Sequence, residues 1–114
     1  DSSDAFLQSM QLLFEQPKYD EIELSEKILS GQLTLLQAKL ASTYCYNLKK
    51  FKCADDLWNY ILLANPNSIE AITGKIRIFL NKNLQNEAKQ WLYKGLGLAP
   101  RYIPLRELEM ESGL

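Results

Sequence analysis

Apolar residues recur along the chain at three- and four-residue spacing, and short polar or proline-containing breaks separate the apolar stretches. This pattern predicts a row of α-helices. The predicted helices cover residues 4–16, 19–29, 34–48, 52–64, 69–80 and 85–98, and a short seventh begins at Pro104. Because no stretch shows the apolar–polar alternation of a strand, the sequence predicts an all-α chain.

The breaks between these helices contain residues that end or begin helices. Pro17 ends the first helix because its ring and its missing N–H do not fit a helix interior, and Gly31 ends the second. Pro66 ends the fourth helix, and Ser68 can cap the fifth. In the second helix, the predicted apolar stripe consists of Ile22, Leu29 and either Leu24 or Ile28. In the seventh, the predicted apolar face consists of Leu105, Leu108 and Met110.

Four pairs of residues recur at an interval of 34 positions, namely Ala54 and Ala88, Trp58 and Leu92, Leu62 and Leu96, and Pro66 and Pro100. This interval indicates that residues 35–68 and 69–102 are two copies of one sequence repeat. A small residue lets two helices approach closely, a bulky residue one turn later fills the space between neighbours, and the proline forces a turn. Units of this kind cannot bury a core alone, so we expect them to stack on one another.

The repeated pattern resembles the tetratricopeptide repeat family, in which a 34-residue helix–turn–helix carries these residue types. The matching residues are Ala38, Ala41, Ser42, Cys45, Phe51, Ala54, Trp58, Ile61 and Pro66, then Ile72, Phe79, Ala88, Leu92, Gly95 and Pro100. Two departures are Lys75, where the family usually has an apolar residue, and Gly74 in a helix interior. A generic helical bundle is the alternative.

The resemblance implies a single domain over residues 1–114, in which antiparallel helix hairpins stack as a short right-handed solenoid. Residues 1–34 hold the repeat pattern poorly and would form a divergent N-terminal hairpin. The last segment, residues 103–114, would cover the end of the second repeat.

In this family, the first helices of the repeats line a concave face that receives a peptide or a partner helix. The corresponding residues here are Leu36, Lys39, Thr43, Tyr46, Asn47, Glu70, Thr73, Arg77, Leu80 and Asn81. Lys39 and Arg77 could hold a carboxylate, or they could be ordinary surface charges. The Lys–Asn–Arg clamp of members that bind chaperone C-termini is incomplete, because Thr43 stands where an Asn is expected.

The resemblance therefore implies a protein–protein interaction module, an adaptor or chaperone-like scaffold that binds a peptide or helix of a partner protein. A secretion-system chaperone is a narrower version of this hypothesis. The alternative is a structural or homo-oligomerising subunit that associates through residues 4–29, because Phe6, Leu7, Leu12 and Phe14 are more apolar residues than one packed face needs. Tyr60 and Tyr93 are the aromatic residues expected to be exposed.

Charge is unevenly distributed along the 114 residues, although the net charge is only −1. Residues 1–30 contain two Lys and seven Asp or Glu, whereas residues 31–106 contain eleven Lys or Arg and four Asp or Glu. The pI of about 5.5 argues against nucleic acid as the main partner. No apolar run approaches the ~20 residues of a membrane-spanning helix. We expect a cytoplasmic protein. The chain begins without Met, so a targeting segment could have been removed, and a periplasmic or other location stays an alternative.

The sequence offers no combination of residues for catalysis or for a cofactor. It contains no His, which removes the commonest general base, and Gly95 and Gly97 are not followed by the Lys of a phosphate-binding loop. Cys45 and Cys53 would lie about 12 Å apart on one continuous helix, too far for a disulfide, and could meet only across a turn. Two Cys alone do not make a zinc site. We expect a protein that is not an enzyme, binds no metal or cofactor, and buries both thiols.

Overall fold

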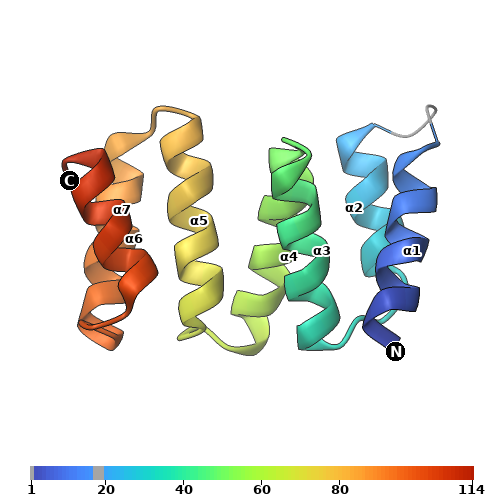
Figure 1. Cartoon of the computed structure of the whole chain (residues 1–114), viewed down its shortest axis with the longest axis horizontal. Helices are drawn as coiled ribbons and strands as arrows, with labels where there is room; N and C mark the ends of the chain where they lie inside the picture. Colours follow the sequence, from blue (N-terminus) through green and yellow to red (C-terminus); the bar gives the residue numbers. More distant parts are fainter. Residues whose placement is uncertain (1, 17–19) are drawn as a thin grey trace. The chain divides into compact units, whose positions relative to one another are not determined.

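The structure is a computed structural model that describes residues 2–16 and 20–114. These residues form seven α-helices and no strand (Figure 1): α1 Ser2–Phe14, α2 Glu21–Leu29, α3 Leu35–Asn47, α4 Phe51–Ala64, α5 Ile69–Asn81, α6 Gln85–Leu98 and α7 Ile103–Ser112. The all-α prediction is confirmed, and the helix ends lie close to the predicted ones. The stop predicted at Pro17 and the start predicted at residue 19 lie outside the described residues.

Side-chain caps explain where three of the helices begin. Asp20 accepts a hydrogen bond from the Glu23 N–H at 2.8 Å at the start of α2. Thr34 and Gln37 form a reciprocal capping box at the start of α3. Ser68 caps α5, as predicted, by accepting from the backbone of its third helical residue. Each cap satisfies a backbone N–H that the helix cannot pair internally.

The backbone of α3 and α4 recurs in α5 and α6 at the interval found in the sequence. The first and last residues of α3 and α5, and those of α4 and α6, each lie 34 positions apart. Both turns use a non-glycine residue of positive φ, Lys49 at 61° and Asn83 at 59°. Matching hydrogen bonds close the two turns, from Lys50 N–H to Cys45 O at 2.8 Å and from Leu84 N–H to Phe79 O at 2.9 Å. The period of 34 is therefore a property of the backbone as well as of the side chains.

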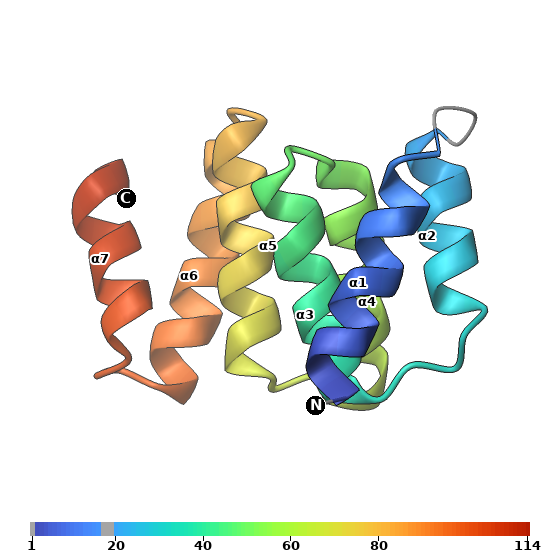
Figure 2. The same ribbon diagram turned by 45° about the vertical axis from the view of Figure 1, so that its right-hand side comes forward.

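The chain divides into two compact units, Asp1–Ile61 and Leu62–Leu114, and the division falls within α4. In the first unit, α1 contacts both α2 and α3 (Figure 2). Its buried apolar residues are Met10, Leu24, Ile28, Leu33, Ala38, Ala41, Cys45, Cys53, Ala54, Leu57, Trp58 and Ile61. Met10 is the only buried residue among the described side chains of α1, so α1 contributes little to this core.

Polar contacts tie α2 and the loop after it to α4. The buried Ser25 hydroxyl of α2 donates to Asp56 Oδ2 of α4 at 2.7 Å. Within α4, Lys52 Nζ donates to the other carboxylate oxygen, Asp56 Oδ1, at 2.5 Å. The hydrogen bond with Asp56 raises the pKa of Lys52 above its ordinary value, which favours the charged donor. The Tyr60 hydroxyl donates to Leu33 O at 2.8 Å. Tyr60 is therefore half-buried and tethers the loop, and the prediction that it is exposed is wrong.

The apolar stripe of α2 differs in part from the predicted one. Leu24 and Ile28 are buried, whereas Ile22 is 55% exposed and Leu29 is half-buried. Leu24 and Ile28 lie one turn apart on one face, and Ser25 next to them carries the bond to α4. Ile22 lies outside that face, so its assignment to the stripe is corrected.

The second unit is built on the α5–α6 hairpin, and α7 contacts both of its helices. Its core cluster consists of Ile72, Ile76, Ala88, Leu92, Leu105 and Leu108. Leu105 and Leu108 of α7 are buried as predicted, whereas Met110 is 82% exposed and does not belong to the covering face. Gly95 allows the close approach, because a Cβ built there would lie 2.9 Å from Leu105 Cδ1 and 3.2 Å from Ile72 Cγ2.

Lys75 replaces the expected apolar residue of the second repeat without breaking the packing. Its side chain is buried, and its ammonium lies 5.2 Å from the centre of the Phe79 ring and 5.8 Å from that of Trp91. Lys94 lies 5.2 Å from the centre of the same Trp91 ring. Aromatic faces stabilise a cation at such distances. A charged residue therefore occupies this position among aromatic partners.

Candidate functional site

A groove between α1 and α3 is the candidate site in the first unit. It has a volume of about 310 Å³ and is lined by Leu7, Lys39, Leu40, Thr43, Tyr44 and Asn47. Lys39, Thr43 and Asn47 follow one another at four-residue intervals, so they share one face of α3. All three are residues predicted to face a partner. Leu7, from the first hairpin, supplies the opposite wall.

The lining of this α1–α3 groove combines apolar and polar side chains. Leu7, Leu40 and Tyr44 supply apolar surface, and the Tyr44 ring is positioned by an edge-to-face contact with Phe14 at a centroid distance of 5.1 Å. Thr43 and Asn47 are exposed and can exchange hydrogen bonds with a peptide backbone, while Lys39 brings a cation. The groove can therefore hold an apolar side chain next to a carboxylate.

The other residues predicted on α3 lie outside this groove. Leu36 is exposed one turn before Lys39 and is not part of the lining. Tyr46 is half-buried and packs against Phe51, with ring centroids 5.4 Å apart. The predicted set on α3 thus divides into three residues that line the groove and two that do not.

The residues predicted on α5 belong to the second unit. Arg77 and Leu80 are half-buried and Asn81 is exposed, with the Asn81 side-chain amide donating to Arg77 O at 2.9 Å. Thr73 is only 2% exposed, and its hydroxyl donates to Ile69 O at 2.7 Å. The assignment of Thr73 to an exposed face is therefore corrected, because its side chain and its hydrogen-bonding capacity are both used inside the fold.

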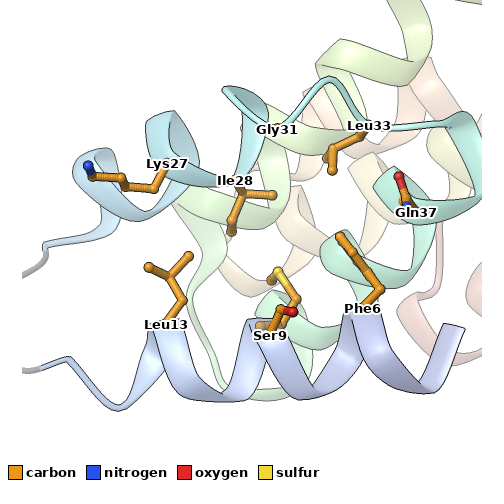
Figure 3. Close-up of a pocket in the computed structure, with 9 residues that line it drawn as sticks. Phe6, Ser9, Leu13, Lys27, Ile28, Gly31, Leu33 and Gln37 are labelled. Atoms are coloured by element: carbon orange, nitrogen blue, oxygen red, sulfur yellow. The ribbon is translucent and has the colours of Figure 1, made fainter. Parts of the chain in front are cut away.

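A second hollow, of about 270 Å³, lies between α1 and α2 (Figure 3). In Figure 3, Phe6, Ser9 and Leu13 of α1 point across it toward Ile28 and Leu33. The remaining lining residues are Met10, Lys27, Gly31 and Gln37. Helix α1 is thus flanked by a hollow on each side, which agrees with its small share of the buried core.

Three lining residues of the α1–α3 groove were not predicted as site residues. Leu7 lies in the segment where the 34-residue pattern fails, so the repeat could not place it. Leu40 and Tyr44 are an apolar pair four residues apart on α3, each one position after a predicted residue. Their four-residue spacing, next to the predicted residues, is the signal in the sequence that could have identified Leu40 and Tyr44.

Comparison with known proteins gives no match to a protein-family model, to a curated protein or to a solved structure. Within residues 2–16 and 20–114, no helix is long and apolar enough to cross a membrane. The same residues bring no three Asp, Glu or Cys side chains together where a metal ion could be held.

Proposed function

We propose that this protein is a small helical-repeat module of the tetratricopeptide type that binds a peptide or helix of a partner protein, as an adaptor or chaperone-like scaffold. The observation that carries the proposal is the α1–α3 groove. Lys39, Thr43 and Asn47 line it together with apolar side chains. Such a mixed lining suits a polypeptide with an apolar side chain near an acidic group.

The recurrence of the backbone supports the assignment to this repeat type. Helix bounds, turn geometry and closing hydrogen bonds return after 34 positions, which is the length of the tetratricopeptide unit. Ala54 and Ala88 are both fully buried, and Trp58 and Leu92 are buried one turn later. These are the small and bulky positions of the repeat.

Charge reversal in the groove tests the proposed function. Peptides selected on the immobilised chain from a random display library are expected to carry an apolar residue close to an acidic residue or to the C-terminal carboxylate. Lys39→Glu is expected to weaken their binding roughly tenfold, equivalent to about 1.4 kcal/mol, because it replaces an attractive charge with a repulsive one. Fluorescence anisotropy with labelled peptides measures the loss.

The matched control is Lys50→Glu, which makes the same charge change at an exposed position outside the groove lining. It is expected to leave binding within about twofold of the original chain. Circular dichroism should show equal helicity in both variants. Equal weakening by the two substitutions, or none by Lys39→Glu, would place the contact surface elsewhere.

One observation favours the alternative of a structural, self-associating subunit. Leu12 of α1 and Ile22 of α2 are large apolar side chains that are exposed in the first hairpin. A second copy could cover them through residues 4–29. Light scattering over a range of concentrations separates the two functions, since a constant monomer mass contradicts self-association.

A further inference from the structure

The two cysteines of the chain meet at the turn between α3 and α4. Cys45 lies near the end of α3 and Cys53 near the start of α4, and their Sγ atoms are 2.9 Å apart. Both side chains are fully buried, and both are thiols. The turn at residues 48–50 reverses the direction of the chain, so the two sulfurs meet although eight positions separate the cysteines.

We propose that Cys45 and Cys53 form an oxidation site, at which a peroxide converts the two thiols into an intrachain disulfide. A disulfide bond is about 2.05 Å long, so the sulfurs have to approach by less than about 1 Å. Small side-chain rotations cover such a distance. The bond would join the two helices of one hairpin and leave their hydrogen bonds in place.

The surrounding contacts hold the two thiols opposite each other. The buried Ser42 hydroxyl, one turn before Cys45, donates to Ala54 O at 2.8 Å, next to Cys53 in the chain. On the other side, the Lys50 N–H donates to Cys45 O at 2.8 Å. These two bonds fix α3 against α4 on both sides of the sulfur pair. The packing of α3 against α4 therefore holds the two thiols close together.

The chemistry balances with hydrogen peroxide as the oxidant. One thiolate attacks a peroxide oxygen, the O–O bond breaks, and a sulfenic acid and hydroxide form. The second thiol then attacks that sulfur, an S–S bond forms, and the oxygen leaves as water after protonation. In total, two thiols give up two electrons and two protons, and one peroxide becomes two waters.

The hairpin formed by α5 and α6 provides an internal control. At the positions 34 residues after the two cysteines, it has Phe79 and Glu87. Its turn is closed by the corresponding hydrogen bond and has a positive φ at the corresponding residue, but it carries no thiol. Any effect of the disulfide should therefore be confined to α3 and α4, whereas general oxidative damage would not discriminate between the hairpins.

The test treats the full reduced chain with hydrogen peroxide and measures intact mass, peptide linkage and stability. We expect a mass loss of about two hydrogens, a linked peptide pair containing Cys45 and Cys53, and reversal by dithiothreitol. The melting temperature should rise by roughly 5–10 °C. Hydrogen exchange should slow in α3 and α4 and stay unchanged in α5 and α6.

Other outcomes would overturn the proposal. They are persistent thiols after prolonged peroxide, sulfinic or sulfonic acid without a linked pair, and linkage only between two chains. The variants Cys45→Ser and Cys53→Ser should lose the two-hydrogen change and the rise in melting temperature. If either variant fails to fold, the mass and linkage measurements on the unsubstituted chain still decide the question.

Discussion

Replacement of Gly95 by leucine is expected to lower the free energy of unfolding by about 3 kcal/mol or more. A Cβ atom alone would lie 2.9 Å from Leu105 Cδ1 and 3.2 Å from Ile72 Cγ2, closer than normal contact. The leucine side chain adds three further carbons where α6 meets α5 and α7. Because Ile72 and Leu105 are fully buried, they have to shift or α7 has to detach. Urea unfolding followed by circular dichroism measures the loss.

Gly97→Leu is the matched control, because Gly97 lies two residues further along the same helix, and apart from its own stretch of helix no described atom lies within 4 Å of its ideal Cβ. This substitution should leave stability unchanged or raise it by up to about 1 kcal/mol, since leucine favours a helix more than glycine does. Equal stability of the two variants would contradict the close packing of α6 in the second unit.

Trp58→Ala is expected to destabilise the protein by about 3–5 kcal/mol. Trp58 is 6% exposed, so its removal would leave a large cavity. The buried indole N–H has no hydrogen-bond partner among the described residues, so packing and not polar bonding accounts for the stabilisation. Trp58→Phe should therefore retain much of the stability. Thermal and urea unfolding of both variants provide the measurement.

The control for this prediction is Tyr93→Ala, which removes an aromatic ring that is 59% exposed. A surface change of this kind should alter stability by no more than about 0.5 kcal/mol. If Trp58→Ala and Tyr93→Ala behave alike, the bulky position of the first repeat does not carry the packing assigned to it.

The order and ends of the helices could be predicted because the signals are local. Ser68 caps α5 with its own hydroxyl, and Pro66 and Gly31 stand at breaks between helices. The buried faces of the short helices were harder to predict. Helix α2 has only nine residues, so its pattern left the choice between Leu24 and Ile28 open. The structure buries both, and Ser25 on the same side contacts Asp56 of α4. Met110 has apolar character, but its face of α7 meets no core.

The candidate site could be predicted only in part. Lys39, Thr43 and Asn47 share a face because helical geometry alone places them there. Leu7 could not be assigned to the opposite wall, because it lies on another hairpin and the contact of α1 with α3 is tertiary. The position of Thr73 in the repeat suggested exposure, whereas its burial depends on the packing of the whole helix.

The turns at Lys49 and Asn83 have the same backbone geometry, but the positive φ costs a different amount of free energy in each. A left-handed backbone brings the Cβ of an ordinary residue close to the next carbonyl, at roughly 1–2 kcal/mol, whereas asparagine tolerates it better. Lys49 bears this strain in the turn between α3 and α4, while Asn83 occupies the same place between α5 and α6. Transient fraying should therefore start more often at the Lys49 bend. The residue type at this one position thus makes the turn between α3 and α4 easier to open than the turn between α5 and α6.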